Sequence, residues 1–149
     1  MRLISLSFCA LVAVAGGCGG SGPKYAPVSG VVTLDGKPYN DGVVVFLPKA
    51  TSDNPNPGRS SAGETNDKGE FVLKTDDLKN GAVVGKHLVK ISTRGPVMQF
   101  DPAVGSPDNA PANVKRDLIP AEWNTMSDKE FEVPAGGTDK ANFDIVSKK

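Results

Sequence analysis

Turn-forming residues divide residues 28 to 146 into short runs, and this spacing limits the folds that the chain can adopt. The runs are rich in Val, Ile, Phe and Thr, which favour β-strands, whereas Gly, Pro, Asn and Asp lie between them. No stretch after residue 18 keeps apolar residues at helical spacing over three turns, so little helix is expected. Seven short strands are predicted, which suits an all-β sandwich: residues 29–34, 43–47, 62–65, 70–74, 87–93, 129–133 and 141–146.

Two of the turns carry residues that specify their geometry. Asp35-Gly36 predicts a two-residue hairpin turn, because type I′ geometry needs a positive φ at both central residues. Residues 66–69 predict a type I turn that ends with Gly69 in the left-handed region. Because side chains alternate along a strand, Phe71 and Leu73 are expected to face the core after this turn.

The strand predicted at residues 87–93 begins with the single histidine of the chain. Val89 and Ile91 share one face of this strand and are predicted to point inward, and His87 lies on the same face. A lone histidine has few partners for catalysis. A packed or hydrogen-bonded structural role is therefore favoured for His87 over a catalytic one.

The first residues are typical of an export signal. Met1-Arg2 gives a positive start, and an apolar run from Leu3 to Ala15 is followed by two small residues, Gly16 and Gly17. The run has thirteen residues, whereas a helix that crosses a bilayer needs about 20, so a permanent transmembrane helix is the weaker interpretation. Removal of residues 1–17 by cleavage after Gly17 is expected.

The segment Ala15-Gly16-Gly17-Cys18 resembles the bacterial lipobox, with Ala15 where leucine is usual. This resemblance implies that Cys18 is acylated, with palmitate or a similar fatty acid, and becomes the mature N-terminus. Two or more acyl chains hold a protein stably at a membrane, where a single chain is marginal. The alternative is an ordinary export signal that leaves Cys18 as a thiol. The only other cysteine, Cys9, lies in the signal, so the mature chain has no intramolecular disulfide.

The remainder divides into a flexible tether at residues 18–27 and one domain at residues 28–149. The tether is rich in Gly, Ser and Pro, and 149 residues with 38% hydrophobic content support one core. Five segments of the domain, in this order, resemble the carboxypeptidase regulatory-like domain: residues 28–32, 35–38, 42–46, 65–71 and 85–89. This resemblance implies a transthyretin-like (prealbumin-like), seven-stranded Greek-key β-sandwich on a small lipoprotein. The module has no catalytic role, and His87 stands where the family more often has tyrosine.

A long connection at residues 95–125 has five prolines and no convincing strand or helix pattern. Connections of this length are uncommon in compact domains and are often functional, so this segment is the predicted contact surface for a partner. Phe100 and Trp123 are the candidate partner-binding residues, because large aromatic groups anchor interfaces and stack on sugars. The alternative is that Ile119 and Trp123 hold the connection against an open end of the sandwich.

The residue counts exclude several classes of function. Seventeen basic and seventeen acidic residues form no basic patch, so nucleic acid is not an expected partner. One histidine and one mature cysteine do not supply a histidine-based zinc or iron site. The aspartates, Asp117 among them, match no calcium loop and are expected to be solvated turn residues. No metal or cofactor is predicted.

The predicted function is therefore a non-catalytic envelope protein, exported and anchored by lipid, that binds an envelope protein or a polysaccharide. The side of the envelope that it faces, periplasm or cell surface, stays open. The alternative, from another functional class, is a small envelope hydrolase that uses loop carboxylates. Such an enzyme needs two acids that converge in a pocket, with at least one shifted pKa.

Overall fold

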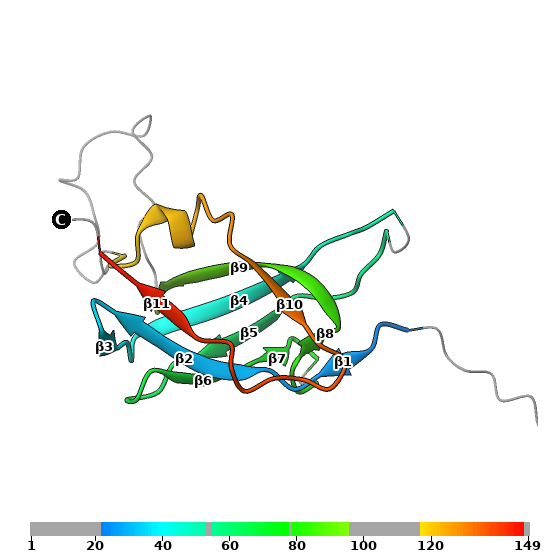
Figure 1. Cartoon of the computed structure of the whole chain (residues 1–149), viewed down its shortest axis with the longest axis horizontal. Helices are drawn as coiled ribbons and strands as arrows, with labels where there is room; N and C mark the ends of the chain where they lie inside the picture. Colours follow the sequence, from blue (N-terminus) through cyan, green and yellow to red (C-terminus); the bar gives the residue numbers. More distant parts are fainter. Residues whose placement is uncertain (1–21, 53–54, 78, 96–116, 148–149) are drawn as a thin grey trace, which may run out of the picture.

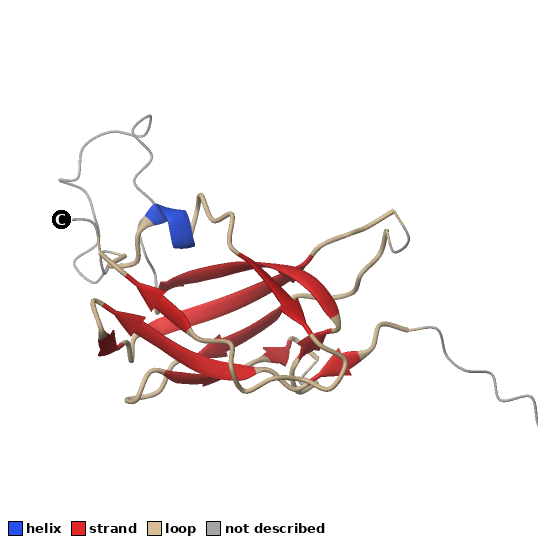
Figure 2. Cartoon of the chain, in the orientation of Figure 1, coloured by secondary structure: helices blue, strands red, loops and turns tan. Residues whose placement is uncertain are grey.

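The regular secondary structure of the described residues is almost entirely β-strand, and the strands form several sheets, as Figures 1 and 2 show. The computed structural model describes residues 22–52, 55–77, 79–95 and 117–147. The helical segment in these ranges is a short 3-10 turn, η2 (Ala121–Trp123), so the expected scarcity of helix is confirmed. No helix in the described ranges combines the length and the apolar character needed to cross a membrane.

The strands are, in chain order, β1 (Tyr25–Ala26), β2 (Ser29–Leu34), β3 (Lys37–Pro38), β4 (Gly42–Pro48), β5 (Ser61–Glu64), β6 (Glu70–Val72), β7 (Lys74–Thr75), β8 (Ala82–Val83), β9 (Gly85–Thr93), β10 (Glu130–Val133) and β11 (Phe143–Ile145).

The largest sheet has five antiparallel strands in the order β10-β9-β4-β5-β7. Its centre is the long pair of β4 and β9, whose register runs from Gly42 opposite Thr93 to Pro48 opposite His87. Alternate residues of both strands are fully buried, as a strand with one face on a core requires.

The second sheet is built around β2, which pairs with β3, β6 and β11. β3 and β6 are antiparallel to β2, whereas β11 is parallel to it. The segment Glu70–Thr75 connects the two sheets, because β6 pairs with β2 and β7 pairs with β5 of the five-stranded sheet. Leu73, between β6 and β7, is fully buried at this crossing point. A separate two-stranded sheet pairs β1 with β8 at the end where the N-terminal segment enters the fold (Figure 1).

The inward side chains of both sheets form one core, and aromatic rings make up its middle. Phe143 of β11 lies 6.2 Å, between ring centroids, from Phe46 of β4 and 6.1 Å from both Phe71 of β6 and Phe131 of β10. Burying one such side chain contributes about 1.5–3 kcal/mol. Rings from four strands thus hold the two sheets together.

The seven predicted strands are all present, and Phe71, Leu73, Val89 and Ile91 are buried as expected. The predicted strand at 70–74 is two strands, because the segment changes sheets at Leu73. The sequence pattern missed β1, β3 and β8, which have two residues each and are too short for alternation to show.

The prediction of a flexible tether at residues 18–27 is wrong for Tyr25 and Ala26, which form β1. Tyr25 and Ala26 pair with Val83 and Ala82, and Ala26 is fully buried. The backbone also packs closely here, because a Cβ at Gly81 would lie 1.9 Å from the carbonyl oxygen of Ala26. The domain therefore begins about three residues earlier than residue 28.

Both predicted turns adopt the expected backbone. Asp35 and Gly36 have φ values of 52° and 75°, as a type I′ turn requires. In the second turn, the Asn66 side-chain oxygen accepts hydrogen bonds from the backbone N–H groups of Lys68 and Glu70. Gly69 follows with a φ of 74°. A Cβ at Gly69 would lie 2.4 Å from the carbonyl oxygen of Val32, whereas a Cβ at Gly36 would meet no atom within 4 Å.

These two glycines allow backbone strain to be separated from crowding. Gly36→Ala should lower the free energy of unfolding by about 1–2 kcal/mol, the cost of a left-handed residue that has a Cβ. Gly69→Ala should lower it by at least twice as much, because the new Cβ also displaces the Val32 carbonyl from its strand. Urea unfolding of both variants measures the difference. Equal losses would show that crowding at Gly69 has no energetic effect.

Candidate functional site

The outer face of the five-stranded sheet is the surface most suited to contact another molecule. β4 carries Val43, Val45 and Leu47 on this face, and all three side chains are half-buried. Leu88 of β9 lies opposite Leu47, and the exposed Ala62 of β5 lies opposite Val45. β4 is therefore apolar on both faces, although only one of them covers the core. A strand with one solvated face normally alternates apolar and polar residues.

Charged residues of both signs surround this apolar stripe. Lys49 forms an ion pair with Glu130, and the Arg94 guanidinium Nε lies 3.3 Å from a Glu64 carboxylate oxygen. Lys90 stands opposite Val45 in the register of β4 and β9. Exposed pairs of this kind contribute about 0–1 kcal/mol to stability, so they specify what the surface accepts more than they hold the fold.

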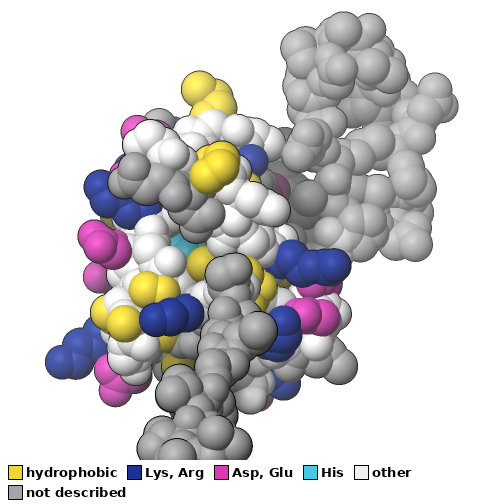
Figure 3. All heavy atoms as spheres, turned by 90° about the vertical axis from the view of Figure 1, so that its right-hand side faces the viewer, with side chains coloured by type: hydrophobic (Ala, Val, Ile, Leu, Met, Phe, Trp, Pro, Cys, Tyr) yellow, Lys and Arg dark blue, Asp and Glu magenta, His cyan; other side chains and the backbone are white. Residues whose placement is uncertain are grey.

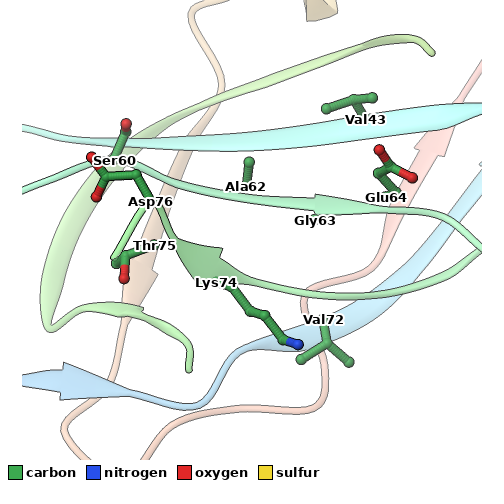
Figure 4. A pocket seen from close by; sticks show the side chains of 9 residues that line it. All are labelled: Val43, Ser60, Ala62, Gly63, Glu64, Val72, Lys74, Thr75 and Asp76. Atoms are coloured by element: carbon green, nitrogen blue, oxygen red, sulfur yellow. The ribbon is translucent and has the colours of Figure 1, made fainter. Parts of the chain in front are cut away.

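A groove of about 530 Å³ lies in this face, beside β5 (Figure 4). Its floor is Ala62 and Gly63, and Val43 and Val72 stand at its sides. Glycine is needed in the floor, since a Cβ at Gly63 would lie 2.5 Å from the carbonyl oxygen of Val72. The polar groups at the rim are Ser60, Glu64, Lys74, Thr75 and Asp76.

The outer face of the second sheet is more polar. The Thr33 hydroxyl donates a hydrogen bond to the Asp144 carboxylate at 2.6 Å, and the Asn142 side-chain oxygen accepts one from the Val31 N–H. Polar groups on this face therefore bond to one another between β2 and residues 142–144. β6 of this sheet carries Val72, which is 57% exposed, so the contrast is between β4 and the pair of β2 and β11. β4 therefore offers the better candidate contact surface.

Of the two partner-binding residues predicted from sequence, Trp123 lies within the described residues and Phe100 does not. Trp123 lies in η2, half-buried, with its ring 6.0 Å from that of Phe143 and the Lys129 ammonium 5.3 Å from its centroid. Ile119 is 4% exposed, so both residues pack on the core as the alternative interpretation expected. A role of Trp123 in partner binding stays a prediction. Phe100, Gly17 and Cys18 lie outside the described residues.

A second apolar surface lies where the long connection rejoins the fold. Leu118 and Met126 are 55% and 76% exposed and line a groove of about 410 Å³ together with Pro120 and Glu122. Val146, just after β11, is 70% exposed. Methionine adapts to varied apolar partners, so this end of the domain is a second candidate contact surface.

Asp117 has a role that the sequence did not reveal. It was predicted to be a solvated turn residue, but one of its oxygens accepts hydrogen bonds from the Thr93 N–H, the Thr93 hydroxyl and the Ile119 N–H, at 2.8–3.0 Å. The other oxygen accepts a bond from the Asn124 side chain. The Thr93 hydroxyl, 2.8 Å from the Tyr39 hydroxyl, also accepts the Leu118 N–H. Asp117 therefore fastens the end of the long connection to the end of β9.

The carboxyl groups whose pKa is shifted do not resemble a general acid. A hydrogen bond from Thr75 lowers the pKa of Asp77, and one from Lys49 lowers the pKa of Glu130. Both groups are exposed and ionised at neutral pH, whereas a catalytic acid needs a raised pKa. In the part of the chain that the structure describes, no three His, Cys, Asp or Glu side chains lie close enough to hold a metal ion.

No protein-family description, curated protein or solved structure matches this chain.

The bonds of Asp117 predict a measurable effect on stability. Asp117→Ala leaves the N–H groups of Thr93 and Ile119 without their acceptor, and each unpaired buried donor costs about 1–3 kcal/mol. We expect a loss of at least about 2 kcal/mol by urea unfolding. Asp117→Asn should lose less, because its amide oxygen still accepts these bonds.

Asp128→Ala is the matched control. The Asp128 side chain is 85% exposed and lies 3.5 Å from the neighbouring Lys129, so its removal should change the free energy of unfolding by less than about 0.5 kcal/mol. A similar loss in the Asp117 and Asp128 variants would contradict the anchoring role of Asp117.

Proposed function

We propose that this chain is a non-catalytic binding module of a bacterial envelope, held at a membrane by lipid on Cys18. The proposal includes a transthyretin-like sandwich of the carboxypeptidase regulatory-like kind, which the five resembling segments and the single core between two sheets support. The observation that carries the binding function is the apolar outer face of β4. That face suits a protein of the envelope, whose own apolar surface would cover Val43, Val45 and Leu47.

The geometry of the chain entry supports an anchor at Cys18. β1 begins at Tyr25, and an extended chain spans about 3.5 Å per residue, so at most about 25 Å separate Cys18 from the domain. Figure 1 shows that the chain enters at one end of the long axis, with the strands of the large sheet running along that axis. A lipid at Cys18 would hold this end toward the bilayer and leave the outer sheet face open at the side.

The hydrolase alternative lacks a supporting observation among the described carboxylates. Asp77 and Glu130 have a lowered pKa, and the acids at the rim of the groove, Glu64 and Asp76, lie near Arg94 and Arg59 respectively. Carboxylates that are paired with cations in this way shape a binding surface. We therefore propose binding, and not hydrolysis, as the function.

The anchor is tested by two cysteine variants in a bacterial host. Cys18→Ser should abolish labelling by an alkyne-bearing fatty acid and move the protein from the detergent phase to the aqueous phase. Cys9→Ser, within the predicted signal, should leave both properties unchanged. Mass spectrometry of the purified wild-type protein should find residue 18 acylated at the mature N-terminus. An intact leader or a free Cys18 thiol would disprove the anchor.

The contact surface is tested by photo-crosslinking in intact cells. A benzoylphenylalanine at Lys90, beside Val45 on the outer face, should form a covalent adduct with an envelope protein. The same residue at Lys37, an exposed position on β3 of the second sheet, is the control and should give none. A third probe at Met126 tests the surface near the long connection. Adducts only from Met126, or equal adducts from Lys37 and Lys90, would refute the sheet face. A polysaccharide adduct would refute a protein partner.

A further inference from the structure

The only histidine of the chain is buried at the end of the domain where the N-terminal segment enters. His87 is 1% exposed and lies near the start of β9, opposite Pro48 of β4 and Phe131 of β10. Figure 3 faces this end of the molecule, where the histidine shows as a small cyan patch enclosed by other side chains. Neither the fold topology nor the proposed binding surface requires an ionisable group at this position.

The hydrogen bonds of His87 define its charge and its tautomer. Nδ1 lies 3.0 Å from the carbonyl oxygen of Gly85, which can only accept, so Nδ1 carries the hydrogen. Nε2 is buried and has no hydrogen-bond partner among the described residues. In the neutral ring Nε2 bears only a lone pair, which tolerates an apolar setting better than a charged N–H group does. The Phe46 ring, centred 5.5 Å from the imidazole, is part of that setting.

The charged groups around His87 would not stabilise an imidazolium. A cavity of about 220 Å³ beside the ring is lined by apolar residues of β8 and of the loop after β4, and its charged lining residues are Lys49 and Lys86, both cations. On β10, Glu130 and Glu132 flank Phe131, and Glu130 is paired with Lys49 on the outer side of the sheet. No carboxylate lines the cavity in the part of the chain that the structure describes.

Protonation of His87 is therefore linked to local opening of the fold around it. Burial lowers the pKa of His87, so the folded domain keeps the ring neutral at pH values where an exposed histidine is already charged. A solvent-exposed histidine has a pKa of about 6.5. The free energy of opening is therefore greatest above pH 6.5 and falls as the pH drops below this value, because the opened state binds a proton more readily. Glu130 and Asp77, whose pKa values are lowered, stay ionised in this range.

In the described part of the chain, two of the strands beside His87 each pair with one other strand. β10 is an edge strand that pairs only with β9, and β8 has two residues that pair only with β1. Segments with few partners open at a lower free energy than central strands do. We propose that His87 is a pH-sensitive switch: in mild acid its protonation loosens the corner formed by β8, the start of β9 and β10, while the second sheet stays closed. Because β1 pairs with β8, this loosening reaches the point where the chain enters the fold.

The test is amide hydrogen exchange of the wild-type protein at pH 7.5 and 5.5, corrected for the intrinsic effect of pH. The opening constants of Val84, Leu88 and Phe131 should rise between pH 7.5 and 5.5, by up to about tenfold. Those of Val32 and Ile145 in the second sheet should change less than threefold. A uniform rise in all five amides, or no rise near His87, would overturn the proposal.

Two further measurements test the role of His87 directly. His87→Asn retains a donor for the Gly85 carbonyl but does not titrate, so its opening constants near position 87 should lose the acid dependence. If this variant fails to fold, imidazole ¹⁵N shifts of the wild-type protein decide the question. They should show the Nδ1–H tautomer with a midpoint below 6.5. A midpoint at or above 6.5, or the Nε2–H tautomer, would overturn the proposal.

Discussion

The packing around Phe143 is the interaction on which the other parts of the structure depend. Its ring contacts Phe46 and Phe131 of the five-stranded sheet, Phe71 of the second sheet and Trp123 of η2. Each contact is worth about 0.5–1.5 kcal/mol beyond the area that it buries. Because these rings come from both sheets and from the end of the long connection, one residue near the C-terminus sets how the sheets face each other. The outer faces are fixed by the same packing, since side chains alternate along each strand.

Because side chains alternate along each strand, the residues on the outer faces can differ without changing the core, and the two sheets differ in this respect. On the second sheet the outward residues Thr33 and Asp144 bond to each other, so that face is satisfied internally. On β4 the outward residues are apolar, and the protein itself leaves them half-exposed. Neither arrangement is needed for the core, which both sheets complete with their inward side chains. A partner that covers β4 would therefore add contacts without repacking the interior.

Sequence reasoning predicted what depends on local pattern and missed what depends on distant contacts. The strand positions, the inward residues such as Val89, and the positive φ values at Asp35, Gly36 and Gly69 all follow from neighbours in sequence. The Asp117 bonds do not, because its acceptor role arises only when Thr93 lies beside it, 24 residues earlier in the chain. An Asp that accepts the N–H of the second residue after it is a known local motif, and this pattern at residues 117–119 was the one available signal. The groove beside β5 was likewise missed, since it depends on β6 approaching Gly63. The transthyretin-like topology, the lipid anchor and the binding role stay predictions.

The parallel pairing of β11 with β2 has a mechanical consequence. β2 follows soon after the point where the chain enters the domain, and β11 lies close to the C-terminal end of the described chain. Tension applied at the two ends would draw these strands in opposite directions along their length. The hydrogen bonds between them would then bear the force together, in shear, and would not break one after another as they do when a hairpin is unzipped. A body tethered at one end and loaded at the other would resist extension most strongly at this strand pair.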